Sequence, residues 1–579
     1  MAVKMLRALA LSDARFPRLS LRAGLLLILF AMVAFMTAYP LSLVFINSFQ
    51  VGAPGEPVRW GLDAWRSAFA DPTIPGVLGN TFFLAGVRVV IALTLAIFFA
   101  WVVTRTDTPC KGFIEFSLWL GFFLPHLPIT IGWILLLDPD FGVLNQFLMK
   151  LFGLPKAPFN IYSYGGIIWA HLAFGTSIRF LLITPAFRSM DAALEEAAYT
   201  SGCNNLSTLL RITIPILAPA IIAAVILGFV KALQSLEVEL AIGFPAGILV
   251  YSTKIWEYLK WEPARYGPAT ALSSFFIVAI FALVLVQRIM LGRREFTTIT
   301  GRGYTSRRTR LGPWRWLTFS LCILFIAVMI YMPLLFLILG TFMRIFGLFN
   351  IPDPWTARHW LGAFDDPTFL VSLRNTLLLG LGAGVFGSIF YALVSYVLVR
   401  LRFTGRGVLD LLAWLPWALP GVLTGLALLW VFLGSGSVLA SLYGSIYLLI
   451  LAIIISELPL GTQILKASVL QVHRELEEAA WASGAPWLYT FRRIVVPLLA
   501  PAMFAVGLVT FISAVRDIPT VVFLATFDSR TLSLLMLDYI AGGSFEKSTV
   551  IGVLVIILII VAAVLARILG LRMGNAEQT

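Results

Sequence analysis

Seven polar or charged side chains lie toward the outer ends of two long apolar segments, one in each half of the chain. They are Lys231, Gln234, Ser235, Glu237, Glu239, Arg516 and Asp517. Ionisable groups within a bilayer are costly and usually face a cavity or a partner. We therefore predict that these residues line a passage for a solute. The alternative is that they lie beyond the hydrocarbon at the helix ends, and their mixed charge leaves the sign of the solute open.

Other polar residues give no pattern typical of an enzyme. The four histidines, His126, His171, His359 and His473, lack the H-x-x-E and H-E-x-x-H spacings of metal sites. The three cysteines are far apart, and no phosphate-binding G-x-x-x-x-G-K-[ST] loop is present. We expect no catalytic residue, no metal and no cofactor on this chain. Glu457 and Arg88, also within apolar segments, are more typical of pairing between helices or of snorkelling.

A second feature is a polar stretch that occurs twice with identical spacing, each time between two apolar segments. Its shared positions are Glu196, Ala197, Ala198, Gly202, Ile212 and Pro215 in the first copy, and Glu478, Ala479, Ala480, Gly484, Ile494 and Pro497 in the second. Glu and Ala favour helix, the glycine allows a turn, and the proline suits the first turn of a following helix. Each copy therefore predicts a short helix–turn–helix at the membrane face. An ordinary connecting loop is the alternative, but it does not explain two copies.

These two copies resemble the EAA loop, E-A-A-x-x-x-G-x9-I-x-L-P, of importer-type ABC transporter permeases. Only the leucine differs, being Ile214 and Val496 here. The resemblance covers essentially the whole chain and is strongest to fused permeases of the ferric-iron, thiamine, phosphonate and polyamine group. It implies that each loop docks on a cytoplasmic ATPase, with the glutamates fixing the loop or contacting the ATPase. The glycines would then allow the turn, and the alanines close packing.

The elements that position these residues are membrane helices. The 579 residues are 60% hydrophobic and 12% charged, and the mean hydropathy is +0.93, so this is not a soluble globular chain. The net charge of +13 is explained by basic residues at alternate ends of the apolar segments, which argues against nucleic-acid binding. We expect twelve helices: 23–45, 81–103, 113–137, 165–185, from after Pro215 to about 241, 269–289, 317–342, 376–399, 408–432, 440–464, 498–525 and 550–569.

The predicted order is a cytoplasmic tail (1–22), transmembrane domain 1 (23–290), a basic cytoplasmic linker (291–315) and transmembrane domain 2 (316–579). The second half repeats the first: Trp360, Phe364 and Asp366 match Trp65, Phe69 and Asp71, and Arg400 matches Arg105. Each half has an even number of helices, so the repeats are parallel. The expected fold is all-α and membrane-integral, with about twelve transmembrane helices in two six-helix repeats like those of type I ABC importers.

Taken with the resemblance, these features predict the permease subunit of an ATP-driven importer in a bacterial inner membrane, with both termini cytoplasmic. Its expected partners are two copies of an ABC ATPase, which would hold ATP and Mg²⁺, a soluble substrate-binding protein and the lipid bilayer, with no nucleic acid. Ferric iron is the first candidate substrate, followed by phosphonate, thiamine or a polyamine. The rival is a secondary transporter driven by an ion gradient, which explains the duplication but not the two EAA loops. A membrane-embedded enzyme is disfavoured, because no nucleophile–base pair is evident.

Overall fold

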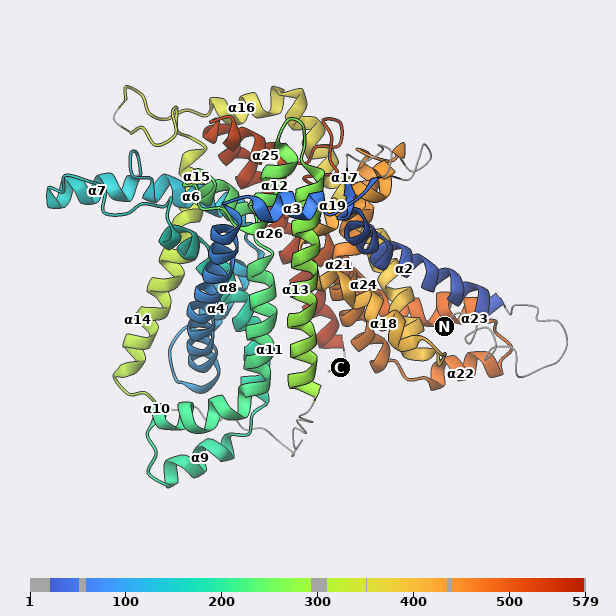
Figure 1. Ribbon diagram of the computed structural model, residues 1–579. Helices are drawn as coiled ribbons and strands as arrows, with labels where there is room; N and C mark the ends of the chain where they lie inside the picture. Colours follow the sequence, from blue (N-terminus) through green and yellow to red (C-terminus); the bar gives the residue numbers. More distant parts are fainter. Residues whose placement is uncertain (1–20, 52–58, 293–309, 350, 435–439, 577–579) are drawn as a thin grey trace.

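The computed structural model describes residues 21–51, 59–292, 310–349, 351–434 and 440–576 (Figure 1). Ten helices in these residues are long and apolar enough to cross a membrane, or twelve if each of two bent helix pairs is one crossing. This confirms the all-α, multi-pass membrane fold. Residues 1–20 of the predicted tail (1–22) and most of the linker at 291–315 lie outside the described residues, and Leu21 and Arg22 begin α2.

The first half runs from α2 to α13. Its elements are α2 (Leu21–Asn47), β1 (Gln50–Val51), β2 (Arg59–Trp60), α3 (Asp63–Ala70), α4 (Ile74–Arg105), α5 (Lys111–Phe123), α6 (His126–Leu137), α7 (Val143–Phe152), α8 (Tyr164–Ser189), α9 (Ala192–Thr200), α10 (Asn205–Thr208), the π-helix η1 (Leu209–Thr213), α11 (Ile214–Leu233), the π-helix η2 (Glu239–Gly243), α12 (Tyr251–Lys260) and α13 (Tyr266–Gly292). The two strands pair antiparallel, Gln50 opposite Trp60.

The second half repeats the order of the long helices. It comprises α14 (Trp314–Ile326), the π-helix η3 (Ala327–Tyr331), α15 (Met332–Gly340), α16 (Arg358–Asp365), α17 (Pro367–Arg400), α18 (Arg406–Trp414), the 3₁₀-helix η4 (Leu415–Ala418), α19 (Gly421–Gly434), α21 (Ile446–Gln471), α22 (Glu475–Ala482), α23 (Trp487–Thr490), the π-helix η5 (Phe491–Val495), α24 (Val496–Arg516), α25 (Leu532–Ala541) and α26 (Phe545–Ala576).

Two predicted helices, 113–137 and 408–432, are each present as a bent helix pair, because prolines break them. α5 and α6 meet at an angle of 103°, and the α18–η4 segment meets α19 at 111°. Pro125 caps the start of α6, and Pro420 directly precedes α19. Proline lacks the N–H that would continue the helix and disfavours helical geometry in the residue before it. The breaks turn polar residues near them, such as His126, toward the middle of the molecule.

The predicted fifth and eleventh helices are also shorter than expected. α11 ends at Leu233 rather than about 241, and α24 ends at Arg516 rather than 525. In the second half the carboxylate of Asp517 accepts a hydrogen bond from the backbone N–H of Thr520 at 2.9 Å, which forms a local turn that competes with helix. The polar residues directly after both helices, Gln234, Ser235 and Asp517, therefore lie in non-helical chain, whereas Glu239 begins the π-helix η2.

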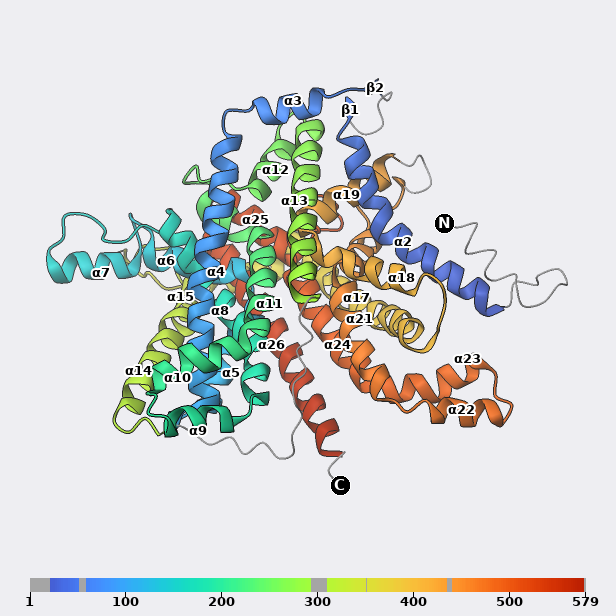
Figure 2. The ribbon, with the colours of Figure 1, turned by 60° about the horizontal axis from the view of Figure 1, so that its bottom comes forward.

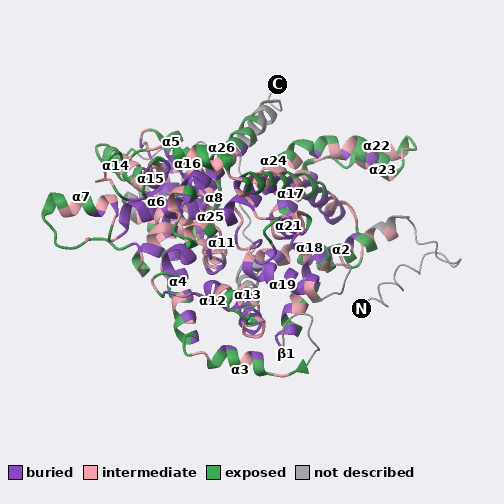
Figure 3. Cartoon of the chain, turned by 90° about the horizontal axis from the view of Figure 1, so that it is seen from above, coloured by how far each residue is buried: buried purple, intermediate pink, exposed green. Residues whose placement is uncertain are grey.

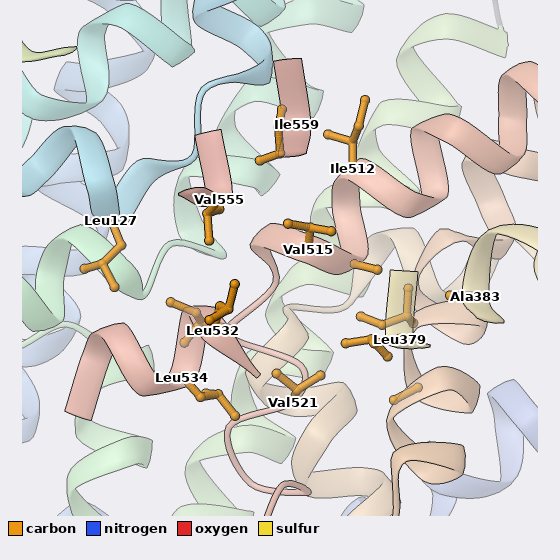
Figure 4. Close-up of a cluster of buried hydrophobic side chains, with 14 of the residues drawn as sticks. Leu127, Leu379, Ala383, Ile512, Val515, Val521, Leu532, Leu534, Val555 and Ile559 are labelled. Atoms are coloured by element: carbon orange, nitrogen blue, oxygen red, sulfur yellow. The ribbon is translucent and has the colours of Figure 1, made fainter. Parts of the chain in front are cut away.

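The two halves interlock through their first helices. α2 packs against α18 and α19 of the second half, while α15 packs against α6 of the first half. The buried core is continuous across this boundary. Figure 4 shows Leu127 of α6 beside Val555 of α26 and Leu532 of α25, and all three belong to one hydrophobic cluster. Seen from above, exposed residues predominate on the peripheral elements α3, α7, α22 and α23 (Figure 3).

The repeat is parallel in the structure. The duplicated segments α9–α10 and α22–α23 lie on one side of the helix bundle, and α3, α12, α16 and α25 lie on the other (Figures 1 and 2). On that second side, each half has the same hydrogen bond between an aspartate and a tyrosine. Asp71 accepts a hydrogen bond from Tyr258 at 2.8 Å, and Asp366 accepts one from Tyr539 at 3.0 Å.

These two aspartates predict an acid-dependent loss of stability. Burial alone would raise the pKa of Asp71, but hydrogen bonds from Thr73, Lys254 and Tyr258 outweigh it and hold the pKa below its usual value. The pKa of Asp366 is lowered in the same way, burial being outweighed by bonds from Thr368 and Tyr539. A carboxylate with a lowered folded-state pKa stabilises fully above its unfolded pKa of about 3.9 and loses this as the pH falls through the folded value.

We therefore expect Asp71→Asn to lower the apparent Tm of the detergent-solubilised protein at pH 7, by the equivalent of about 1–3 kcal/mol. Asp366→Asn should cost less, because only Asp71 also has an ion pair, with Lys254 at 3.0 Å. Thermal unfolding between pH 7 and pH 3 tests this. The difference from wild type should shrink toward acid pH, and a difference that stays constant would contradict the assignment.

Candidate functional site

The first duplicated segment is a helix–turn–helix on one side of the bundle. α9 ends in a Schellman turn in which the N–H of Cys203 reaches the carbonyl of Ala198 at 3.0 Å, and Gly202 has a φ of 85°. Only glycine adopts this left-handed conformation without strain. Asn204 then accepts a hydrogen bond from the N–H of Ser207 and begins α10. The chain passes through η1 directly into α11.

The second segment repeats this geometry element by element. α22 ends in the same turn, with the N–H of Ala485 on the carbonyl of Ala480 at 3.0 Å and a φ of 83° at Gly484. α23, η5 and α24 follow at the spacing of α10, η1 and α11. We call 192–208 and 475–490 the coupling segments. Ile212 and Ile494 are half-buried, and Pro215 and Pro497 are exposed in the first turns of α11 and α24.

Each coupling segment is joined to a spanning helix by a buried ion pair. Arg105, the last residue of α4, lies 3.7 Å from Glu195, and Arg400, the last residue of α17, lies 2.8 Å from Glu477. Arg105 also donates to the carbonyls of Phe187 and Met190, and Arg400 to that of Val472. We call these two pairs the arginine clamps. Removing one partner of a buried ion pair strongly destabilises a protein, because the other charge is left buried without compensation.

In each arginine clamp the glutamate is the one directly before the glutamate of the repeated pattern, Glu196 or Glu478. Glu195 and Glu477 are buried, whereas Glu478 is exposed and pairs with Arg474 of its own helix at 3.1 Å. The side chain of Glu196 lies outside the described residues. Ala198 is buried, Ala480 is half-buried, and Ala197 and Ala479 are exposed. The sequence did contain the signal for the clamps: both copies have a Glu-Glu pair, and Arg105 matches Arg400.

A cavity of about 240 Å³ lies between the two halves. The sequence predicted seven residues along a passage, and six of them line this cavity: Lys231, Gln234, Ser235, Glu237, Arg516 and Asp517. Glu239 is fully buried behind the wall. Arg88 and Glu457, which also line it, lie near the middle of α4 and α21, so the cavity is at the mid-depth of the spanning helices.

The first half contributes a buried polar network to the cavity wall. Glu239 of η2 pairs with Arg88 of α4 at 2.7 Å and with His171 of α8 at 3.1 Å. Ser235 donates to the same carboxylate, and Arg88 donates to the carbonyl of Ala232 at 3.1 Å. Glu239 therefore holds two cavity-lining side chains in place from behind. The pairing of Arg88 between helices agrees with the interpretation of the sequence.

The remaining cations of the cavity have polar contacts but no carboxylate within 4.0 Å among the described residues. Lys231 donates to Gln234 at 3.0 Å, and Gln234 in turn donates to the carbonyl of Trp417 in the second half. Arg516 donates to the carbonyl of Phe122 and lies over the rings of Phe122 and Phe174. Sequence analysis missed Arg179, His126 and His171 as cavity residues, because they come from segments far apart in the chain.

A family model and two similar proteins relate this chain to transport-system permeases. The model of the family "Binding-protein-dependent transport system inner membrane component" matches residues 384–575. The chain is 26% identical over 540 residues to the ferric transport system permease protein FbpB of Actinobacillus pleuropneumoniae, covering 92% of this chain and 76% of that protein. It is 25% identical over 522 residues to a putative ferric transport system permease protein of Haemophilus influenzae, covering 87% and 78%.

A shorter relative and a solved structure match about half of the chain. The probable sulfate transport system permease protein cysT of Nephroselmis olivacea is 30% identical over 267 residues, which cover 44% of this chain and 89% of that protein. A crystal structure of a bacterial alginate ABC transporter aligns with a TM-score of 0.41 and 21% identity, covering 49% of this chain and 97% of that one.

Proposed function

Because the chain belongs to the family of binding-protein-dependent transport-system inner-membrane components, we propose that it is the complete membrane pathway of an ATP-driven importer. It is an ABC importer permease, and both halves of the pathway are in one polypeptide. In this proposal the solute arrives from a soluble binding protein on the α3–α12–α16–α25 side. It then passes through the central cavity, and two ATPase subunits dock on the coupling segments in the cytoplasm.

The observation that carries this proposal is the pair of coupling segments. They lie on the same side of the bundle, have the same turn at Gly202 and Gly484, and run into spanning helices that end at the cavity. A displacement of either segment would be transmitted along α11 or α24 to the cavity wall. Two segments suit two ATPase subunits, so one copy of this chain would serve one complex in the bacterial inner membrane. The rival secondary-transporter function does not require this arrangement.

Ferric iron is the substrate that we propose first. Two relatives that match most of the chain are named as ferric transport permeases. Three cavity carboxylates, Glu237, Glu457 and Asp517, could contact a cation in transit. No group of three or more His, Cys, Asp or Glu residues able to hold a metal ion occurs in the described part of the chain. Iron would therefore make brief contacts here. Phosphonate, thiamine and polyamines remain alternative substrates.

The proposal is tested by isolating the chain in mild detergent from its own membranes and assaying ATP hydrolysis. We expect an ATPase subunit to co-purify with the wild type. The double variant Glu196→Arg, Glu478→Arg should lose it, because the coupling segments would then present cations to the docking face. Asp63→Arg is the control, since Asp63 is exposed on α3 at the other side of the bundle. Uptake that follows an ion gradient, with no associated ATPase, would favour the secondary transporter instead.

A further inference from the structure

The duplicated fold provides an internal comparison for the polar network in the cavity wall. α17 matches α4, and α21 and α24 match α8 and α11, so the residues of these first-half helices have counterparts in the second half. The counterparts of Arg88 and His171 are Ala383 and Ile453, and both are buried and apolar. The same fold is therefore built in the second half without these charges. Folding alone does not account for the polar residues in the first half.

Arg179 shows the same asymmetry more sharply. Its counterpart in α21 is Gly461, which packs tightly against the ring of Tyr391. In the first half, Arg179 is only 3% exposed and lines the cavity. One Nη donates to the carbonyl of Gly175 at 2.7 Å, but Nε has no hydrogen-bond partner. An arginine buried at membrane depth without a counter-charge is costly, so it is retained where it meets a charged ligand.

The helices around Arg179 leave room for its guanidinium. A methyl group at Gly228 of α11 would lie 2.4 Å from the second Nη, and one at Gly175 would lie 3.1 Å from the first. The counterpart of Gly228 is Thr510, so a glycine is not needed at this place in the helix. No carboxylate lies within 4.0 Å of the guanidinium among the described residues, whereas Arg88 in the same cavity is paired with Glu239.

We propose that Arg179, which lines the same cavity as Arg88, forms a subsite for an oxyanion group of the transported species. The inference rests on the proposed importer function and specifies its substrate class. The planar guanidinium matches the paired oxygens of a carboxylate, sulfate or phosphate. Glu457 and Asp517, which the second half contributes to the same cavity, suit a cationic part of the solute. The cavity thus accommodates either a free oxyanion or a cation with its oxyanion ligand.

The test measures anion binding by the purified full-length chain, without ATPase or ion gradient. Thermal unfolding is followed in sodium sulfate, sodium phosphate or ferric citrate, each compared with sodium chloride at equal ionic strength. At least one oxyanion should raise the apparent Tm of the wild type, and Arg179→Gln should lose this rise. An effect of sulfate or phosphate alone identifies a free oxyanion, and an effect of ferric citrate alone identifies a metal chelate.

Two further variants separate the subsite from a general loss of stability. Gly228→Ala keeps Arg179 but displaces its guanidinium, so the rise should be reduced although the charge remains. Arg188→Gln is the control, because Arg188 is on the same helix, is exposed and pairs with Glu115. It should keep the full rise. Absence of any oxyanion effect in the wild type, or an unchanged effect in both Arg179→Gln and Gly228→Ala, overturns the subsite. Either result leaves the ATPase co-purification, and hence the importer function, intact.

Discussion

We expect Glu477→Arg, which reverses the buried charge in the second arginine clamp, to uncouple ATP hydrolysis from uptake. Glu477 is only 1% exposed. It forms an ion pair with Arg400 at 2.8 Å and accepts a hydrogen bond from the hydroxyl of Tyr396 at 2.6 Å. Removing one partner of a buried ion pair costs about 3–5 kcal/mol, and a second cation would add repulsion. The coupling segment would then separate from the end of α17 and no longer move with it.

The uncoupling is measured as the number of solute molecules transported per ATP hydrolysed in proteoliposomes. We expect this ratio to fall at least about tenfold, since a clamp weakened by only 1.4 kcal/mol is already open ten times more often. Glu195→Arg should have a smaller effect, because its ion-pair distance is 3.7 Å. The double variant should be inactive in transport.

Two controls distinguish lost coupling from lost folding. The exchange Arg400→Glu, Glu477→Arg restores opposite charges and should recover part of the ratio. Asp410→Lys breaks the more exposed pair with Lys466, which is worth about 1 kcal/mol or less, and should leave the ratio unchanged. A Glu477→Arg protein that inserts in the membrane and transports with a normal ratio would show that the clamp has no part in coupling.

The second large effect is expected at Glu239. Glu239→Gln removes the counter-charge of Arg88 and one partner of His171, both of which line the cavity. The cost of leaving a buried arginine unpaired is again about 3–5 kcal/mol. We expect a large fall in apparent Tm together with loss of uptake. This single variant does not show whether the network serves stability or transport.

The second half of the chain supplies the decisive variant. The triple change Arg88→Ala, His171→Ile, Glu239→Val replaces the network with apolar side chains, the first two being those at the equivalent positions of the second half. Removing a whole buried ionic network in favour of apolar residues is often neutral or stabilising. The triple variant should therefore regain the apparent Tm of the wild type while uptake remains lost. Normal uptake by a stable triple variant would mean that the cavity functions without these charges.

The family, the duplication and the coupling segments could be predicted from the sequence, because each depends on local signals. Helices that can cross a bilayer are recognised by the length of their apolar segments. The turns at Gly202 and Gly484 are recognised by glycine, the residue that tolerates a positive φ. The parallel orientation of the halves follows from an even number of crossings.

The ends of the fifth and eleventh helices could not be predicted, and the depth of the polar cluster depended on them. Hydropathy does not distinguish a helix that continues from an apolar chain that turns inside a protein cavity, where other residues satisfy its backbone. For the same reason Lys231 and Asp517 could be recognised as a polar cluster, but the cavity that they line could not be predicted.

The sequence by itself therefore determined the class of protein, its internal repeat and the segments that face the cytoplasm in the proposed importer. Only the tertiary structure decided which charges meet. The pairs Arg88–Glu239, Arg105–Glu195 and Arg400–Glu477 join residues 77 to 151 positions apart, and Arg179 stands without a carboxylate among the described residues. Ion pairing depends on distances of a few ångströms, which the packing of helices sets and the order of residues along the chain does not.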